Sequence, residues 1–77
     1  METKAYILIE TSVGKTLEVC SRLTELDGVE IVDPVTGPYD IIAIINTESL
    51  SSVGDIVTTH IHKIPGVVRT VTCLQLS

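Results

Sequence analysis

Residues 26–29 (LDGV) and residues 64–67 (IPGV) lie 38 positions apart (66 − 28 for their glycines), about half of this 77-residue chain. In both places an apolar residue precedes a glycine and a valine-rich run follows it. The same offset relates four further apolar pairs, namely Ala5 and Ala43, Ile7 and Ile45, Val19 and Val57, and Leu23 and Ile61. Each copy of this unit predicts a strand, a helix and a strand. Two copies give a β-α-β-β-α-β fold in one α+β domain of residues 1–77.

Four apolar runs predict the strands of a single sheet. Residues 4–11 form the first and residues 29–35 the second, where Pro34 removes a ladder hydrogen bond and indicates an edge or bulged strand. Residues 39–46 carry apolar side chains on both faces, so we expect this strand at the centre of the sheet. Residues 67–76 form the last strand and again place apolar groups on both sides.

Two stretches with apolar residues at spacings of three and four predict the helices. We expect the first helix to begin at a Ser12 cap and to end at residues 27–28, and the second to begin at a Thr47 cap and to end at residues 65–66. The apolar stripes expected to face the sheet comprise Val13, Leu17, Cys20, Leu23 and Leu26 in the first helix and Leu50, Val53, Val57, Ile61 and Ile64 in the second.

Two helices cover only one face of a four-stranded sheet, yet three of the expected strands are apolar on both faces. Leaving a large aliphatic side chain in water costs about 1.5–3 kcal/mol relative to burial, against a total stability of roughly 5–10 kcal/mol for a small domain. The sequence therefore predicts an obligate homodimer in which sheet packs on sheet.

Composition and charge argue against several classes of function. The formal net charge is −5, and the five Lys and Arg residues are scattered singly, so we expect no direct nucleic-acid binding. No apolar run approaches the roughly 18 residues that span a bilayer, and no signal peptide is recognisable, which favours a prokaryotic-type cytosol. Cys20 and Cys73 fall within apolar patterns, so we expect reduced thiols in the core.

Three local patterns are better explained by structure than by chemistry. Residues 14–16 (GKT) match the end of a phosphate-binding loop, but Ile9 replaces the glycine that this loop needs five residues earlier. His60 and His62 are two residues apart, which places them on different sides of a helix without further metal ligands. The serines lie at expected helix starts, where capping explains them. We expect no enzymatic activity, no catalytic residue, no metal and no cofactor.

Residues 37–40 (GPYD) combine turn chemistry with functional groups in a hairpin expected to protrude from the sheet. The alternative interpretation is a well-formed hairpin in which Asp40 bonds neighbouring backbone amides. Thr70 and Thr72 share one face of the last strand, and a surface or interface role explains their hydroxyls equally well.

These features resemble the effector domain of the Lrp/AsnC family of transcriptional regulators, often called the RAM domain. The resemblance rests on residues 35–36 (VT), the Gly-x-Tyr-Asp motif at 37–40, the run 41–45 (IIAII) and residues 64–72 (IPGVVRTVT), and it covers nearly the whole chain. It implies a ferredoxin-like sandwich with a four-stranded antiparallel sheet and two helices on one face. It also implies dimers through the sheet faces, octamers or similar rings, and amino-acid effectors bound where dimers meet.

Full-length members of this family carry a helix-turn-helix domain, which is missing before the first expected strand here. The resemblance therefore implies a regulatory module without its own DNA contacts, which modulates transcription by assembling with full-length paralogues. Transferred residue by residue, the effector site comprises Gly37, Tyr39 and Asp40 of the hairpin together with Thr70 and Thr72. Asp40 would receive the α-ammonium, and the Thr hydroxyls and amides near Gly37 the carboxylate, although Pro38 supplies no N–H.

Two other classes of protein share this strand order. An ACT-type amino-acid-binding domain uses a turn before the first helix, but the Asp and Pro expected before Gly14 are replaced by Ser12 and Val13. Small dimeric α/β-barrel enzymes need polar or aromatic groups lining a cavity between sheet and helices, where this chain offers mainly aliphatic residues.

Overall fold

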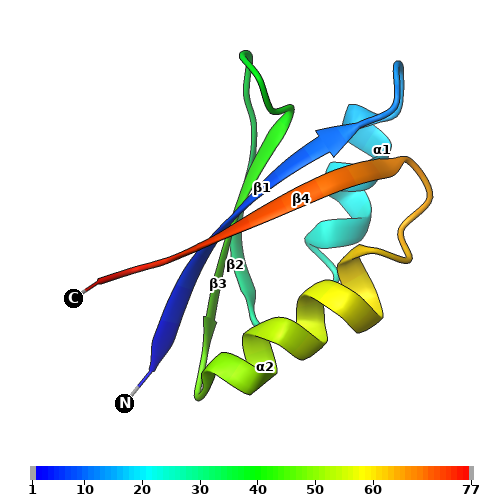
Figure 1. The fold of residues 1–77 in the computed structure, drawn as a ribbon. Helices are drawn as coiled ribbons and strands as arrows, with labels where there is room; N and C mark the ends of the chain where they lie inside the picture. Colours follow the sequence, from blue (N-terminus) through cyan, green and yellow to red (C-terminus); the bar gives the residue numbers. More distant parts are fainter. Residues whose placement is uncertain (1, 77) are drawn as a thin grey trace.

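The computed structural model describes residues 2–76 and has the expected β-α-β-β-α-β order. Figure 1 shows both helical segments on one side of a twisted sheet. All strand pairs are antiparallel, and the strand order is β2-β3-β1-β4. The elements are β1 (Thr3–Thr11), α1 (Thr16–Leu23), β2 (Val29–Pro34), β3 (Ile41–Thr47), α2 (Leu50–Asp55), the π-helix η1 (Ile56–Ile61) and β4 (Val67–Leu74). The predicted fold class is confirmed, as are the central position of β3 and the edge position of β2.

The core lies between the sheet and the helices. Alternate residues of the two central strands point into it, because successive side chains of a strand face opposite sides of the sheet. The buried apolar residues are Ala5, Ile7 and Ile9 of β1, Ile41, Ala43 and Ile45 of β3, Val19 and Leu23 of α1, and Val53, Val57, Ile61 and Ile64 of the second helical segment and its end. The chain therefore builds its core from aliphatic side chains, as the composition indicates.

The first helix begins later than predicted. Gly14 adopts a positive φ of 80°, and the Lys15 N–H donates to the Ser12 carbonyl over 3.0 Å, so residues 12–15 form a turn rather than the first helical turn. Ser12 is not the cap; its N–H instead donates to the Gly66 carbonyl over 2.8 Å. The later start removes Val13 from the helix, leaving it fully exposed, and Leu17 is 74% exposed. Both were wrongly predicted to face the sheet.

The second helical segment is also capped differently from the prediction. Ser49 is the N-cap, and its hydroxyl accepts the Ser52 N–H over 3.2 Å, whereas Thr47 ends β3. Leu50 is consequently 59% exposed rather than part of the buried stripe. The segment continues as the π-helix η1, where the His62 N–H donates to the Val57 carbonyl five residues earlier over 2.9 Å. This widened turn was not predicted, because the spacing of the buried residues is the same as in an α-helix.

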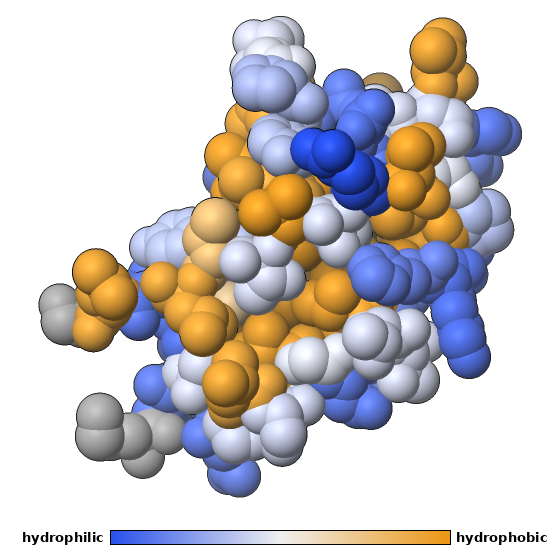
Figure 2. Space-filling model, in the orientation of Figure 1, coloured by the Kyte–Doolittle hydropathy of each residue, from blue (hydrophilic) through white to orange (hydrophobic). Residues whose placement is uncertain are grey.

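The sheet face opposite the helices is uncovered in a single chain, as Figure 1 shows. Strand register places an apolar group there, because Tyr6 lies opposite Ile44 and Cys73, while Leu8 lies opposite Ile42 and Val71. We call these six residues the open-face cluster. Figure 2 shows hydrophobic side chains over the strands of the molecule, interspersed with polar ones.

The two thiols lie in different surroundings. Cys20 packs against the core, and burial, together with the charge of Asp33, raises its pKa. Cys73 is exposed in the open-face cluster, so its assignment to the core was wrong for the isolated chain. The register of a strand decides which face of the sheet each residue lies on. Because β4 has apolar residues on both faces, its sequence alone does not show on which face Cys73 lies.

Candidate ligand-binding site

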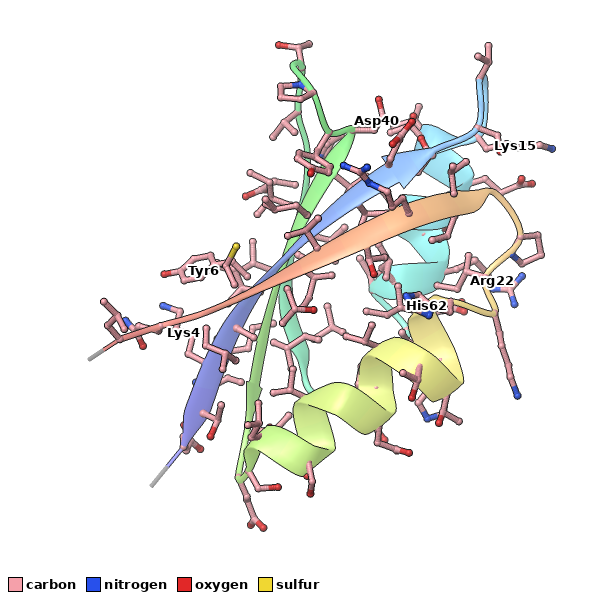
Figure 3. The ribbon with its side chains drawn as sticks, in the orientation of Figure 1. Lys4, Tyr6, Lys15, Arg22, Asp40 and His62 are labelled. Carbon is pink, nitrogen blue, oxygen red and sulfur yellow. The ribbon has the colours of Figure 1, made fainter. Side chains whose placement is uncertain are left out.

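Asp40 lies where the hairpin after β2 returns to β3, beside the end of β1 (Figure 3). Its Oδ2 accepts the backbone N–H of Thr11 over 2.7 Å and the Thr11 hydroxyl over 3.1 Å. The Asp40 N–H in turn donates to the Ile9 carbonyl over 2.9 Å. Asp40 therefore ties the hairpin to β1. Both side-chain bonds use Oδ2, and a carboxylate has about four lone-pair sites, so Oδ1 remains suited to a cation.

Tyr39 is held from the opposite edge of the sheet by Arg69 of β4. The Arg69 Nη2 donates to the Tyr39 hydroxyl over 3.0 Å, and the guanidinium lies 5.8 Å from the centre of the Tyr39 ring. The hydrogen bond to Tyr39 raises the pKa of Arg69, whose Nε also lies 4.0 Å from the Glu10 carboxylate. Arg69 thus links the hairpin to β4, a role that sequence reasoning missed.

Gly37 forms the tip of the hairpin. Its φ of +135° is one that L side chains rarely adopt, and a Cβ added there meets no atom within 4 Å. The glycine is therefore required by the conformation of the turn, while the space beside its backbone is open.

Thr70 and Thr72 lie on the helix side of β4, because they pair with the buried Ile9 and Ile7. The Thr70 hydroxyl lies 2.8 Å from Nε2 of His62, which comes from the end of the second helical segment. Figure 3 shows His62 between this helix end and β4. His62 was expected on a solvated rim; it is exposed, but its contact with Thr70 places it next to a predicted site residue.

The structure brings the predicted site residues together only in part. Tyr39 reaches β4 through Arg69, whereas Asp40 lies at the end of β1 and the two threonines lie on the helix side of β4. A cleft of about 270 Å³ is lined by His62, Val67, Val68, Arg69 and Thr70, without the hairpin residues. In a single chain, the candidate ligand-binding residues thus form two separate groups rather than one enclosed pocket.

A larger cleft of about 630 Å³ lies between the end of α1 and the second helical segment. Its lining includes Glu25, Asp27, Asp55 and His60. It contains none of the predicted site residues. No helix within residues 2–76 is long and apolar enough to cross a membrane.

Comparison with known proteins assigns this arrangement to a family. Residues 4–77 match the Lrp/AsnC ligand binding domain. The chain belongs to this family. The Lrp/AsnC domain described here is therefore a ligand-binding domain of this family. This assignment removes the α/β-barrel enzyme and the ACT-type domain as alternatives.

The similarity extends to both sequence and structure. The HTH-type transcriptional regulator FL11 of Pyrococcus abyssi (strain GE5 / Orsay) is 37% identical over 75 residues, which cover 94% of this chain and 47% of FL11. The Lrp/AsnC domain thus spans about half the length of this curated relative. The crystal structure of FFRP-DM1 is 31% identical with a TM-score of 0.90, covering 96% of this chain and 99% of that chain. TTHA0845 from Thermus thermophilus is 32% identical with a TM-score of 0.93, covering 97% and 94%.

Two more distant structures share the fold and were determined with an amino acid. The regulator NMB0573 of Neisseria meningitidis, in its L-Met complex, is 14% identical with a TM-score of 0.87, covering 97% of this chain and 50% of that chain. The feast or famine regulatory protein Rv3291c of M. tuberculosis, complexed with L-methionine, is 20% identical with a TM-score of 0.83, covering 97% and 50%.

Proposed function

We propose that this domain is an amino-acid sensor that self-assembles and thereby modulates transcription. The match of residues 4–77 to the Lrp/AsnC ligand binding domain carries this proposal. The L-methionine complexes of two distant neighbours support an amino acid as the class of effector. The side-chain selectivity of the site is a property of the assembled pocket.

The proposed effector site comprises Gly37, Tyr39 and Asp40 with Thr70 and Thr72. Asp40 Oδ1 would receive the α-ammonium through a charge-assisted bond worth about 1.5–3 kcal/mol when sheltered. The carboxylate would go to the hydroxyls of β4. Because the hairpin and the threonines form separate groups within one chain, we propose that neighbouring copies complete the site between them.

The proposed assembly begins with a homodimer through the open-face cluster. Burying these side chains offsets the cost of about 1.5–3 kcal/mol that exposure to water imposes on each large apolar group. Dimers would then join into an octamer or a similar ring, and full-length Lrp/AsnC paralogues would enter the same assemblies. Hetero-oligomers in native mass spectrometry of the two purified proteins would support this partner, and separate homo-oligomers would contradict it.

A thermal-shift panel of the twenty amino acids tests the sensor function. A ligand at one hundred times its Kd adds about 2.7 kcal/mol of stability, which shifts the Tm of a domain of this size by about ten degrees or more. We expect a selective rise with one or a few amino acids at millimolar concentration. An unchanged Tm across the whole panel would contradict an amino-acid effector.

A further inference from the structure

The cleft beside His62 lies along an edge of the sheet. In the order β2-β3-β1-β4, strand β4 pairs with β1 on one side only. The cleft of about 270 Å³ opens along residues 67–70 of this strand, with His62 as its wall on the helix side. This is below the roughly 300–1,000 Å³ of pockets for drug-sized molecules, so the cleft suits a small group.

The backbone of Thr70 contributes a donor to this cleft. In an antiparallel ladder, directly opposed residues alternate between bonded and non-bonded pairs. The Gln75 N–H donates to the Lys4 carbonyl over 2.9 Å, which makes every second residue from Gln75 back along β4 a bonded partner of β1. Thr70 falls in the other set, opposite Ile9, whose carbonyl accepts from Asp40 instead. The Thr70 N–H therefore points to the free edge.

The side chains of the cleft add further donors. The imidazole Nε2 of His62 lies 2.8 Å from the Thr70 hydroxyl, so the two polar groups lie side by side in the cleft. The His62 ring reaches this position from the turn that follows η1, where the backbone N–H of His62 donates to the Val57 carbonyl. Arg69 also lines the cleft, but its guanidinium lies on the other face of the sheet, where it donates to the Tyr39 hydroxyl.

Charge distinguishes this cleft from the larger one. The residues that line it include no Asp or Glu, and the ion pair between Arg69 Nε and Glu10, at 4.0 Å, lies on the other face of the sheet. The larger cleft is lined by Glu25, Asp27 and Asp55, whereas a third of about 430 Å³ has Arg22 and Lys63 beside Glu25. In a chain of net charge −5, a cleft that no carboxylate lines and that has the polar groups of His62 and Thr70 suits an anion.

We infer that His62 is a binding residue of the effector site, where its imidazole, with the Thr70 hydroxyl and N–H, takes the effector's carboxylate. This inference rests on the proposed amino-acid-sensing function and adds a residue to its site. The bond between His62 and Thr70 holds the two groups ready in the absence of effector.

The test compares His62→Leu with a matched control, His60→Leu. His60 lies on the same helical segment, is also exposed, and lines the other two clefts instead. Affinities are measured by calorimetry for the amino acid that gives the largest thermal shift, for its carboxamide and for inorganic phosphate. The carboxamide keeps the ammonium and side chain but lacks the negative charge. The Tm of each free variant checks that it is folded.

We expect the parent protein and His60→Leu to prefer the acid over the carboxamide by about tenfold or more, as for a charge-assisted bond. His62→Leu should reduce this preference to near unity, and His62→Gln, whose side-chain amide can donate, should restore part of it. An unchanged preference in His62→Leu would place the carboxylate elsewhere. If inorganic phosphate displaces the amino acid and binds with equal affinity, the anion that the cleft binds is phosphate rather than the effector's carboxylate. This result would overturn the inference.

The two proposals fail in different ways. If no amino acid stabilises the parent protein, the sensor function is wrong, and the anion cleft is then tested with inorganic phosphate alone. Stabilisation by phosphate that is lost in His62→Leu and kept in His60→Leu would support the cleft. Equal behaviour of the two variants would refute it.

Discussion

Asp40 has a structural role that also suits it to its proposed role in ligand binding. Its Oδ2 already accepts two bonds from Thr11, so the carboxylate is fixed in position before any ligand arrives. A positioned charge binds an ammonium more tightly than a mobile one, because the side chain was already ordered during folding. The bonds to Thr11 agree with the structural interpretation of the hairpin and also pre-organise Asp40 for the proposed site.

The substitution Asp40→Asn separates these roles. An Asn side chain still offers one oxygen to Thr11, so we expect the free energy of unfolding to change by less than about 1 kcal/mol. The lost charge should lower amino-acid affinity by about tenfold or more, since a charge-assisted bond is worth about 1.5–3 kcal/mol. Calorimetric titration with the responding amino acid measures this change. Asp33→Asn, at an exposed position of β2, is the control; an unaltered affinity in Asp40→Asn would leave Asp40 with a structural role alone.

At the scale of elements, the bounds of the strands were predicted more accurately from the sequence than those of the helices. Alternating apolar residues gave β1 and β3 to within two residues at each end, because burial of one face fixes their register. The predicted caps Ser12 and Thr47 were wrong, since Gly14 turns the chain before α1 and since Ser49 rather than Thr47 accepts the Ser52 N–H. A serine or threonine near a helix start predicts a cap, but several neighbours compete for that position.

The candidate site was predictable only where its residues are contiguous. The hairpin 37–40 stands out in the sequence through its turn residues, whereas Arg69 and Thr11 reach this hairpin from 30 and 29 residues away. His62 lies eight residues before Thr70, and the connecting turn brings the two together. No local pattern marks such pairs; only the pairing of β4 with β1 and the packing of the helix end place them.

The turn between the second helical segment and β4 depends on Gly66. Its φ is +104°, and a Cβ added there would lie 2.9 Å from Lys15 Cβ and 3.0 Å from Val19 Cγ2. Gly66→Ala should therefore lower the free energy of unfolding by roughly 1–3 kcal/mol, from backbone strain and from the displaced start of α1. Urea denaturation measures the loss. Gly54→Ala is the matched control, because its Cβ meets nothing within 4 Å and alanine favours the helix by roughly 0.5–1 kcal/mol. Equal stability of the two variants would contradict this account.

At the scale of the whole molecule, the helices bury one face of the sheet and leave the open-face cluster uncovered, where we propose that a second copy packs. Lys4 and Tyr6 project from β1 on the side away from the helices in Figure 3, with the Lys4 ammonium 5.5 Å from the Tyr6 ring centre. The charged residues Lys4, Glu10 and Arg69 occupy β1 and β4 at the two ends of this face, and the apolar residues lie between them. An apolar centre with a polar rim is the usual anatomy of a protein interface.

Leu8 lies at the middle of this proposed interface, opposite Ile42 on one side and Val71 on the other. Leu8→Arg should convert the dimer into a monomer at micromolar concentration, because the dimer would bury two guanidinium groups against apolar side chains. The folded monomer should survive with a lower Tm, since Leu8 is outside the buried core. Light scattering coupled to size exclusion measures the mass.

The control variant Leu17→Arg, on the solvent side of α1, should leave the dimer intact. A monomeric parent protein, or a dimeric Leu8→Arg, would exclude the sheet face as the interface. If Leu8→Arg is monomeric and also loses amino-acid binding while its Asp40 hairpin stays folded, the effector site requires more than one copy of the chain.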